Sequence, residues 1–151
     1  MTRTSLKDWN CSLARSLDII GDKWAMLIVR NAFFGTTTFS GFQAELGIAK
    51  NILTNRLKHL TENGILRRLE KDGCYPRYKL TPAGWELSTV FIALLQWGDK
   101  HVPPPGGPPL QIVDRETLQP IRALALQSGD GKPLSTKEVR FAKTPADFEK
   151  R

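Results

Sequence analysis

The residues best suited to chemistry lie in one polar stretch near the middle of the chain. They carry amide, hydroxyl and ammonium groups, with no nucleophile paired to a base: Lys50, Asn51, Thr54, Asn55 and Lys58. Amides and hydroxyls can read base edges, and ammonium groups suit phosphate. Thr54 and Asn55 are therefore the expected base readers, and Lys50 and Lys58 the expected phosphate contacts.

The basic charge of the chain is concentrated around this stretch. The 151 residues carry a net charge of +7, of which residues 47–80, with eight basic and three acidic side chains, contribute +5. A local excess of this kind indicates a polyanionic partner, and double-stranded DNA is the expected one. The alternative interpretation of the polar stretch is a solvated helix face.

Apolar spacing places the polar stretch on a helix. Leu53, Leu57 and Leu60 form one stripe within residues 49–63, so the polar side chains fall on the other faces. A shorter helix precedes it, with Ser40 as the expected cap and Gly47 as the turn. Two helices joined by a short turn predict a helix-turn-helix unit.

Two polar residues of this unit have two interpretations each. Arg56 lies between the polar face and the leucine stripe, so it either reaches phosphate or ties its helix to a neighbouring one. The hydroxyl of Ser40 either caps its helix or joins the helix N-terminus in receiving a phosphate.

A β-hairpin is predicted after Gly64, with its turn at residues 71–76. Three cations surround the turn: Lys71, Arg77 and Lys79. We expect them to enter or border a minor groove, where the negative potential attracts cations; the alternative is a charged surface hairpin. Arg67 and Arg68 are adjacent on a strand and point oppositely, so at most one faces DNA.

The remaining pattern completes a mainly helical α+β fold with three further helices. Residues 12–20 form a short helix, and Asp22 caps a second that should lie at the centre of the core. A long helix begins at Pro82, and its apolar band is broader than a small domain can cover, which predicts a homodimer.

The domain prediction follows from these elements. Residues 1–101 form the DNA-binding and dimerisation domain, the Pro/Gly-rich residues 102–109 form a linker, and residues 110–151 form an extension with a small β-hairpin and a flexible tail. No apolar run is long enough to span a membrane, and two cysteines without CxxC spacing suit a reducing cytoplasm. No metal, cofactor or enzyme site is expected, because no set of ligating or catalytic residues converges in the pattern.

Three stretches resemble the HxlR family of winged-helix regulators, whose architecture is related to that of the MarR group. They are CSLARSLDIIGDKWAMLIVRNAFFG, TTFSGFQAELGIAKNILTNRLKHLTENGIL and PRYKLTPAGWEL, with LQWGDKH following. The resemblance runs from about Cys11 to His101. It implies a dimer paired through the first and last helices of the winged core, with one recognition helix from each subunit in the major groove, acting as a repressor or an activator.

The resemblance also raises the question of an effector. Some members respond to oxidants or electrophiles through an N-terminal cysteine that Cys11 matches, although an inert cysteine is the favoured interpretation here. A small-molecule effector is the other option. Longer members carry zinc-ribbon Cys-Gly pairs in the extension; these cysteines are missing here, which argues against zinc. The alternative function is a winged-helix protein-interaction module without sequence-specific DNA binding.

Overall fold

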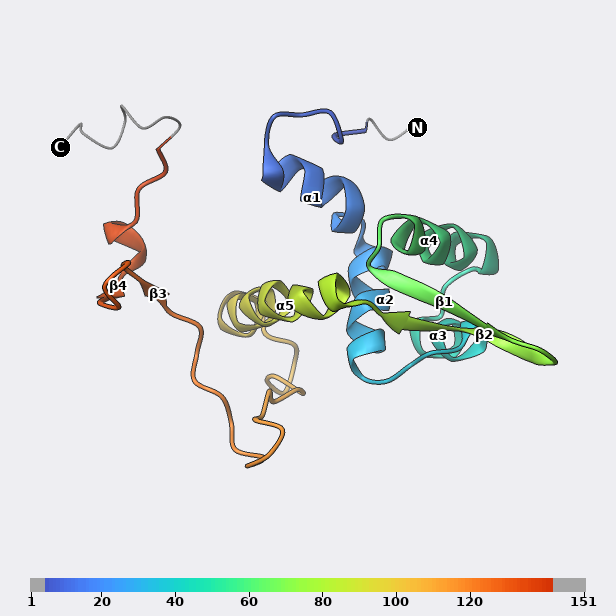
Figure 1. Ribbon diagram of the computed structural model, residues 1–151. Coiled ribbons are helices and arrows are strands. Elements are labelled where there is room, and N and C mark those ends of the chain that lie inside the picture. Colours follow the sequence, from blue (N-terminus) through green and yellow to red (C-terminus); the bar gives the residue numbers. More distant parts are fainter. Residues whose placement is uncertain (1–4, 143–151) are drawn as a thin grey trace. The chain divides into compact units, whose positions relative to one another are not determined.

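The structure, a computed structural model, describes residues 5–142, which group into two compact units that divide between Phe91 and Ile92. The elements run in the order α1 (Ser12–Ile20), α2 (Lys23–Phe33), α3 (Phe39–Leu46), α4 (Lys50–Glu62), β1 (Leu66–Lys71), β2 (Cys74–Leu80), α5 (Pro82–His101), β3 (Leu126–Gln127), β4 (Pro133–Leu134) and the 3-10 helix η1 (Thr136–Glu138) (Figure 1). The predicted boundary after residue 101 stays a prediction. The division between the units lies inside helix α5, which runs without a break to His101.

Helix α2 lies at the centre of the first unit, as predicted. Ala25, Ile28 and Val29 are completely buried in a core cluster to which α3, α4, β1 and β2 also contribute. The carboxylate of Asp22 caps the helix by accepting hydrogen bonds from the amides of Trp24 and Ala25. The sequence therefore fixes both the start and the buried position of this helix.

The helix-turn-helix unit consists of α3 and α4, joined by a turn at Gly47, whose φ of 59° is left-handed. Ser40 does not cap α3, so that prediction is wrong. The cap is Thr38, whose hydroxyl accepts from the amide of Gly41 at 3.1 Å, because the helix begins one residue before Ser40. In α4, the leucine stripe is buried as expected.

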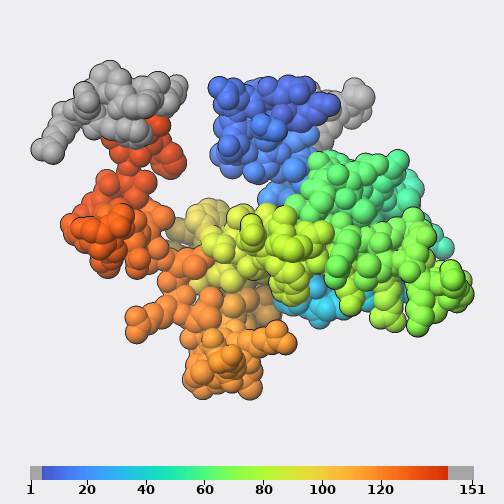
Figure 2. Space-filling model, in the orientation of Figure 1, coloured from blue at the N-terminus to red at the C-terminus, as the bar shows by residue number. Residues whose placement is uncertain are grey.

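The hairpin is longer than the sequence suggested. The strands pair antiparallel from Leu66 opposite Leu80 to Lys71 opposite Cys74, and only Asp72 and Gly73 remain in the turn. The predicted turn at 71–76 was too wide, because a bulge lets residues 74–76 join β2. Figure 2 shows the end of the hairpin projecting beyond the helices of the first unit.

Backbone pairing joins the hairpin to the helix-turn-helix unit. The amide of Tyr78 donates to the carbonyl of Thr37 at 2.7 Å, and Thr38 forms an antiparallel bridge with Arg77. Thr37 and Thr38 thus contact the edge of β2 directly before α3, through one hydrogen bond and one isolated bridge. The start of α3 and the hairpin are held in a fixed relation.

Helix α5 begins where the sequence predicted, with Thr81 accepting from the amide of Gly84 at 3.0 Å. Its first turns pack on α2, where the rings of Trp85 and Phe91 lie 5.5 Å and 5.7 Å from that of Phe33. Farther along, Val90, Leu94 and Trp97 are 49%, 56% and 56% exposed. These three side chains form an apolar strip at helical spacing, and about half of each is exposed.

The second unit contains the expected small β-hairpin, reduced to two residues in each strand. Strands β3 and β4 pair through Leu126 opposite Leu134, and residues 128–132 form the turn. The flexible tail predicted at the end of the extension lies in large part outside the described residues, which end at Ala142. The mainly helical α+β fold with a winged helix-turn-helix and a hairpin extension is confirmed.

Candidate nucleic-acid interface

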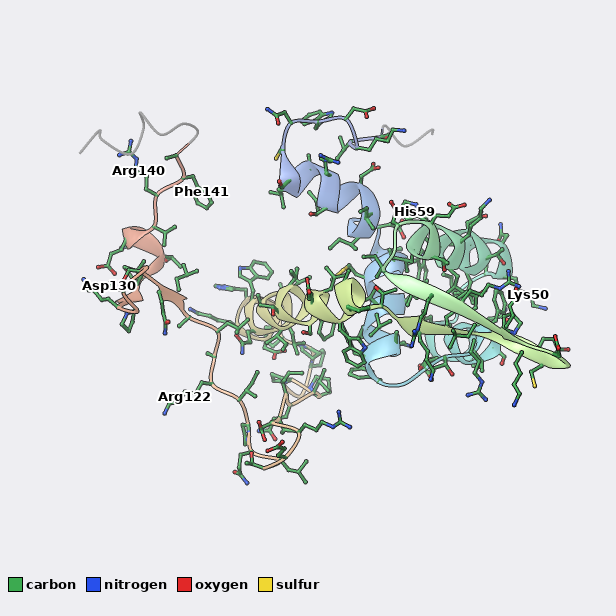
Figure 3. The ribbon with its side chains drawn as sticks, in the orientation of Figure 1. Lys50, His59, Arg122, Asp130, Arg140 and Phe141 are labelled. Carbon is green, nitrogen blue, oxygen red and sulfur yellow. The ribbon has the colours of Figure 1, made fainter. Side chains whose placement is uncertain are left out.

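The polar face of α4 is open to solvent over its whole length. All five residues predicted to lie on this face are exposed: Lys50, Asn51, Thr54, Asn55 and Lys58. The amides of Asn51 and Asn55 make no side-chain hydrogen bond among the described residues, so they keep their donors and acceptors for a partner. Figure 3 shows Lys50 at one end of α4 and His59 near the other.

Thr54 is partly committed to its own helix. Its hydroxyl donates to the carbonyl of Lys50 at 2.8 Å. In this rotamer the oxygen offers lone pairs but no proton to a partner, so it suits a donor group such as the amino group of adenine or cytosine. Lys58 is paired with Glu62 at 3.7 Å, an exposed contact between side chains one helical turn apart.

A groove runs between α4 and the hairpin, which we call the α4 groove. It encloses about 260 Å³ and is lined by Thr54, Lys58, Thr61, Glu62, Arg68 and Tyr78. Two of the predicted contact residues, Thr54 and Lys58, therefore share a hollow with a cation of the hairpin. On the side of the hairpin that faces α4, Arg68 and Tyr78 thus continue the polar surface formed by Thr54 and Lys58.

Arg68 was not selected from the sequence, although one of Arg67 and Arg68 was expected to face DNA. Side chains alternate along a strand, and Leu66 is buried, so Arg68 falls on the core-facing side of the hairpin and Arg67 on the other. Alternation from Leu66 would have identified it. Its guanidinium lies 3.0 Å from the carboxylate of Glu70.

The three predicted hairpin cations lie elsewhere. Lys71, Arg77 and Lys79 line a second hollow of about 700 Å³, and its other lining residues are Thr38, Leu69, Glu70, Gly73, Cys74 and Tyr75. Arg77 and Lys79 flank Tyr78, which lines the α4 groove, so alternation turns them to the opposite face. The basic residues of the hairpin are thus divided between two faces instead of forming one surface with α4.

Arg56 does not share the exposure of the polar face. Its Nε donates to Oδ1 of Asp22 at 2.8 Å and its Nη2 donates to Oδ2 at 3.1 Å. Partial burial acts to raise the pKa of Asp22, but the hydrogen bond and charge of Arg56 and the amides of Ala25 and Trp24 outweigh it and hold this pKa below its usual value. Of the two interpretations, the geometry shows the tie to a neighbouring helix.

Ser40 is exposed in the first turn of α3, close to the hairpin. It lines a hollow of about 390 Å³ with Thr38, Phe39, Tyr75, Pro76 and Tyr78. Its hydroxyl donates to that of Thr38 at 3.5 Å, which is a long hydrogen bond. Since the hydroxyl does not cap the helix and this bond is long, rotation of the side chain would let it donate to a partner instead.

Both cysteines are free and exposed, Cys11 directly before α1 and Cys74 at the start of β2. Among the described residues, no three Cys, His, Asp or Glu side chains gather as metal ligands would. Within residues 5–142, no helix is long and apolar enough to cross a bilayer.

Comparison with known proteins supports the winged-helix interpretation. The family model described as HxlR-like helix-turn-helix matches residues 19–105. The uncharacterized HTH-type transcriptional regulator Rv3095 of Mycobacterium tuberculosis is 39% identical over 103 residues, which is 67% of this chain. The match spans 65% of the length of that relative.

Solved structures agree with this match. The crystal structure of PA1607, described as a candidate transcription factor, superposes with a TM-score of 0.85 at 41% identity, over 93% of this chain and all of that one. The redox regulator HypR in its reduced form gives a TM-score of 0.55 at 26% identity, over 60% of this chain and 92% of that one. The likeness to PA1607 extends beyond the winged core into the second unit.

Proposed function

Since the chain belongs to the HxlR-like helix-turn-helix family, we propose that it is a transcriptional regulator, and not an enzyme, that binds double-stranded DNA as a homodimer. The observation that carries the proposal is the exposed face of α4, where two unpartnered asparagine amides lie between two lysines. A reducing cytoplasm is the compartment we expect, and the proposal needs no cofactor.

The helix α4 is proposed to enter the major groove. Asn51 and Asn55 then present amides to base edges, and Thr54 presents an acceptor. Lys50 and Lys58 neutralise phosphates on either side, and the Ser40 hydroxyl at the start of α3 donates to another. These contacts position the helix and read the sequence at the same time.

The hairpin is proposed to contact the backbone beside the major groove. In this proposal Lys71, near the projecting end, contacts a flanking minor groove, and Arg77 and Lys79 add positive charge on the face turned away from α4. Arg68 supplies charge on the side of the α4 groove. The cations on the two faces of the hairpin would then each meet a phosphate, if the hairpin lies between two stretches of DNA backbone.

The homodimer is supported by apolar side chains that the single chain leaves exposed. Leu13 and Leu17 on α1 are 68% and 44% exposed, and the strip on α5 is exposed to a similar degree. Scattered exposed leucines need no explanation, but strips at helical spacing on two helices do. Two-fold pairing would separate the recognition helices by about 34 Å, one duplex turn, and so select an inverted repeat.

The direct test is DNA binding to the promoter next to the gene for this chain. We expect a gel shift at moderate salt that random duplex of equal length does not give, and an affinity that falls steeply as salt rises. Equal affinity for both duplexes would reject sequence-specific binding. Sedimentation at the same protein concentration tests the dimer.

A winged-helix interaction module without sequence-specific DNA binding is the competing function. Replacing Lys50 and Arg77 together by alanine separates the two. We expect at least about a tenfold loss of operator affinity, since each lost phosphate contact removes part of the counterion-release gain. Unchanged affinity would favour the interaction module.

An oxidant response, if this regulator has one, is proposed to act through Cys11. The thiol is exposed, and the relative HypR is named a redox regulator. Mass spectrometry after mild oxidant should find the Cys11 thiol oxidised before that of Cys74, and Cys11→Ser should abolish any effect of the oxidant on operator binding. Preferential oxidation of Cys74 would contradict this assignment.

A further inference from the structure

Arg56 is attached to the protein more firmly than the other cations of α4. Two parallel N–H···O bonds join its guanidinium to the carboxylate of Asp22, at 2.8 Å and 3.1 Å, and the two side chains are only 30% and 21% exposed. This bidentate geometry fixes orientation as well as distance. The charge of Arg56 is already neutralised, so a phosphate would gain little from it.

Asp22 stands at the corner between α1 and α2. Oδ1, which accepts from Nε of Arg56, also accepts from the amides of Trp24 at 3.0 Å and Ala25 at 3.3 Å. One carboxylate therefore caps α2 and holds α4. The N-terminus of the central core helix and the middle of the recognition helix share one anchor.

A second contact lies on the same side of α4. Nε2 of His59 is 3.2 Å from the carbonyl oxygen of Ile19, in the last turn of α1. Residues 56 and 59 are three apart and so neighbours on one helix face. Helix α4 is thus attached at two adjacent points to residues 19–22, on the side away from its exposed polar face.

We infer that Arg56 is a positioning residue, which through Asp22 sets the orientation at which α4 presents Asn51, Thr54 and Asn55 to DNA, and that it does not itself bind phosphate. The inference rests on the proposed function. It distinguishes Arg56 from Lys50, which has no ion-pair partner among the described residues and whose charge is open to solvent.

The test measures, for each variant, the operator affinity and the dependence of that affinity on salt concentration. Arg56→Gln should weaken operator binding about fivefold or more while the slope of log affinity against log salt stays that of the wild type. Lys50→Ala is the matched phosphate-contact variant and should reduce that slope by about 0.9. Arg122→Ala removes an exposed cation of the second unit and should change neither quantity. A slope reduced by about 0.9 in Arg56→Gln would overturn the inference.

Two further variants separate positioning from charge. Arg56→Lys keeps the charge but lacks the planar fork, so it should fail to restore operator affinity. Asp22→Ser keeps a good helix cap but removes the ion pair, so it should weaken operator binding as Arg56→Gln does, and the double variant should be no worse than either. Affinity for random duplex should be unchanged in all three. Wild-type operator affinity in Arg56→Lys would contradict the inference. So would a loss of operator affinity in the double variant equal to the sum of the two single losses.

The inference can also be judged without DNA. If the wild type binds no duplex, the proposed function fails, and the anchoring of α4 is read from hydrogen exchange. Amides of α4 should exchange faster in both Arg56→Gln and Asp22→Ser, with those of α5 unchanged as the internal control. Unchanged exchange in α4 would show that the ion pair does not hold this helix.

Discussion

The carbonyl oxygen of Ile65 lies 2.2 Å from the point where Gly84 would carry a β-carbon. Gly84 is buried in the first turn of α5, and the backbone amide of Thr81 donates to the same carbonyl at 3.1 Å. The start of α5 is therefore seated directly on the backbone that leads into β1. Only glycine permits this approach.

Gly84→Ala should destabilise the first unit by about 1–3 kcal/mol, because the rigid backbone of Ile65 cannot yield as a flexible side chain would. Gly98→Ala, in the same helix, is the matched control: its β-carbon would meet only Val102 at 4.0 Å, and alanine should stabilise the helix by about 0.5–1 kcal/mol. Urea unfolding measures both. Equal effects of the two substitutions would contradict the steric explanation.

Arg68 should contribute to DNA binding although it was not among the residues selected from the sequence. Arg68→Ala should lower the slope of log operator affinity against log salt by about 0.9 if its guanidinium contacts phosphate. Glu70→Gln frees Arg68 from its acidic neighbour and should raise affinity. A slope equal to that of the wild type in Arg68→Ala would assign this arginine to its pair with Glu70 alone.

Acid should weaken the first unit through Asp22. Its pKa is lowered in the folded protein from an ordinary value of 3.8, so the carboxylate binds protons more readily in the unfolded chain. Its contribution to stability is present above about pH 3.8 and is lost as the pH falls through the lower folded pKa. Thermal unfolding between pH 6 and pH 3 should decline less steeply in Asp22→Asn, which keeps the cap. Parallel declines would show that other carboxylates dominate.

The exposed strip of α5 should be the subunit contact. A charge placed in it would be buried on pairing, so Leu94→Glu should shift the protein from dimer to monomer in sedimentation. Thr89→Glu alters an exposed residue on a different side of the same helix and should leave the dimer intact. A dimer in Leu94→Glu would place the contact elsewhere.

Much of the first unit follows from local sequence signals. Helical spacing located α1, α2, α4 and α5, and Asp22, Gly47 and Pro82 marked helix ends correctly because capping and turn chemistry are local. The cap of α3 was missed since Thr38 and Ser40 are both good caps. Thr38, the residue that caps α3 in the structure, also pairs with Arg77 of the hairpin. This is a tertiary contact, which local sequence signals do not reveal.

The candidate site was predicted less completely than the fold. The helical spacing of the leucines was enough to predict that Lys50, Asn51 and their neighbours are exposed. The buried leucine stripe determines which side of α4 faces the core, and the other sides then face solvent. The direction of Lys71 depends on the bulge between Leu69 and Lys71, which turn signals do not reveal. The other hairpin cations lie in the regular part of the ladder, where alternation from the buried Leu66 and Leu80 was the signal that could have assigned their faces. The partner of Arg56 lies 34 positions away in sequence, beyond any periodic pattern.

The short pairing between Thr37 and Tyr78 joins the hairpin to the entrance of α3, so the two parts proposed to contact DNA are expected to move together. An operator must then offer its groove contacts and its flanking phosphates at one fixed spacing along the duplex. Inserting a single base pair between those two regions is therefore expected to weaken operator binding, because the paired hairpin and α3 would have to follow the shift together.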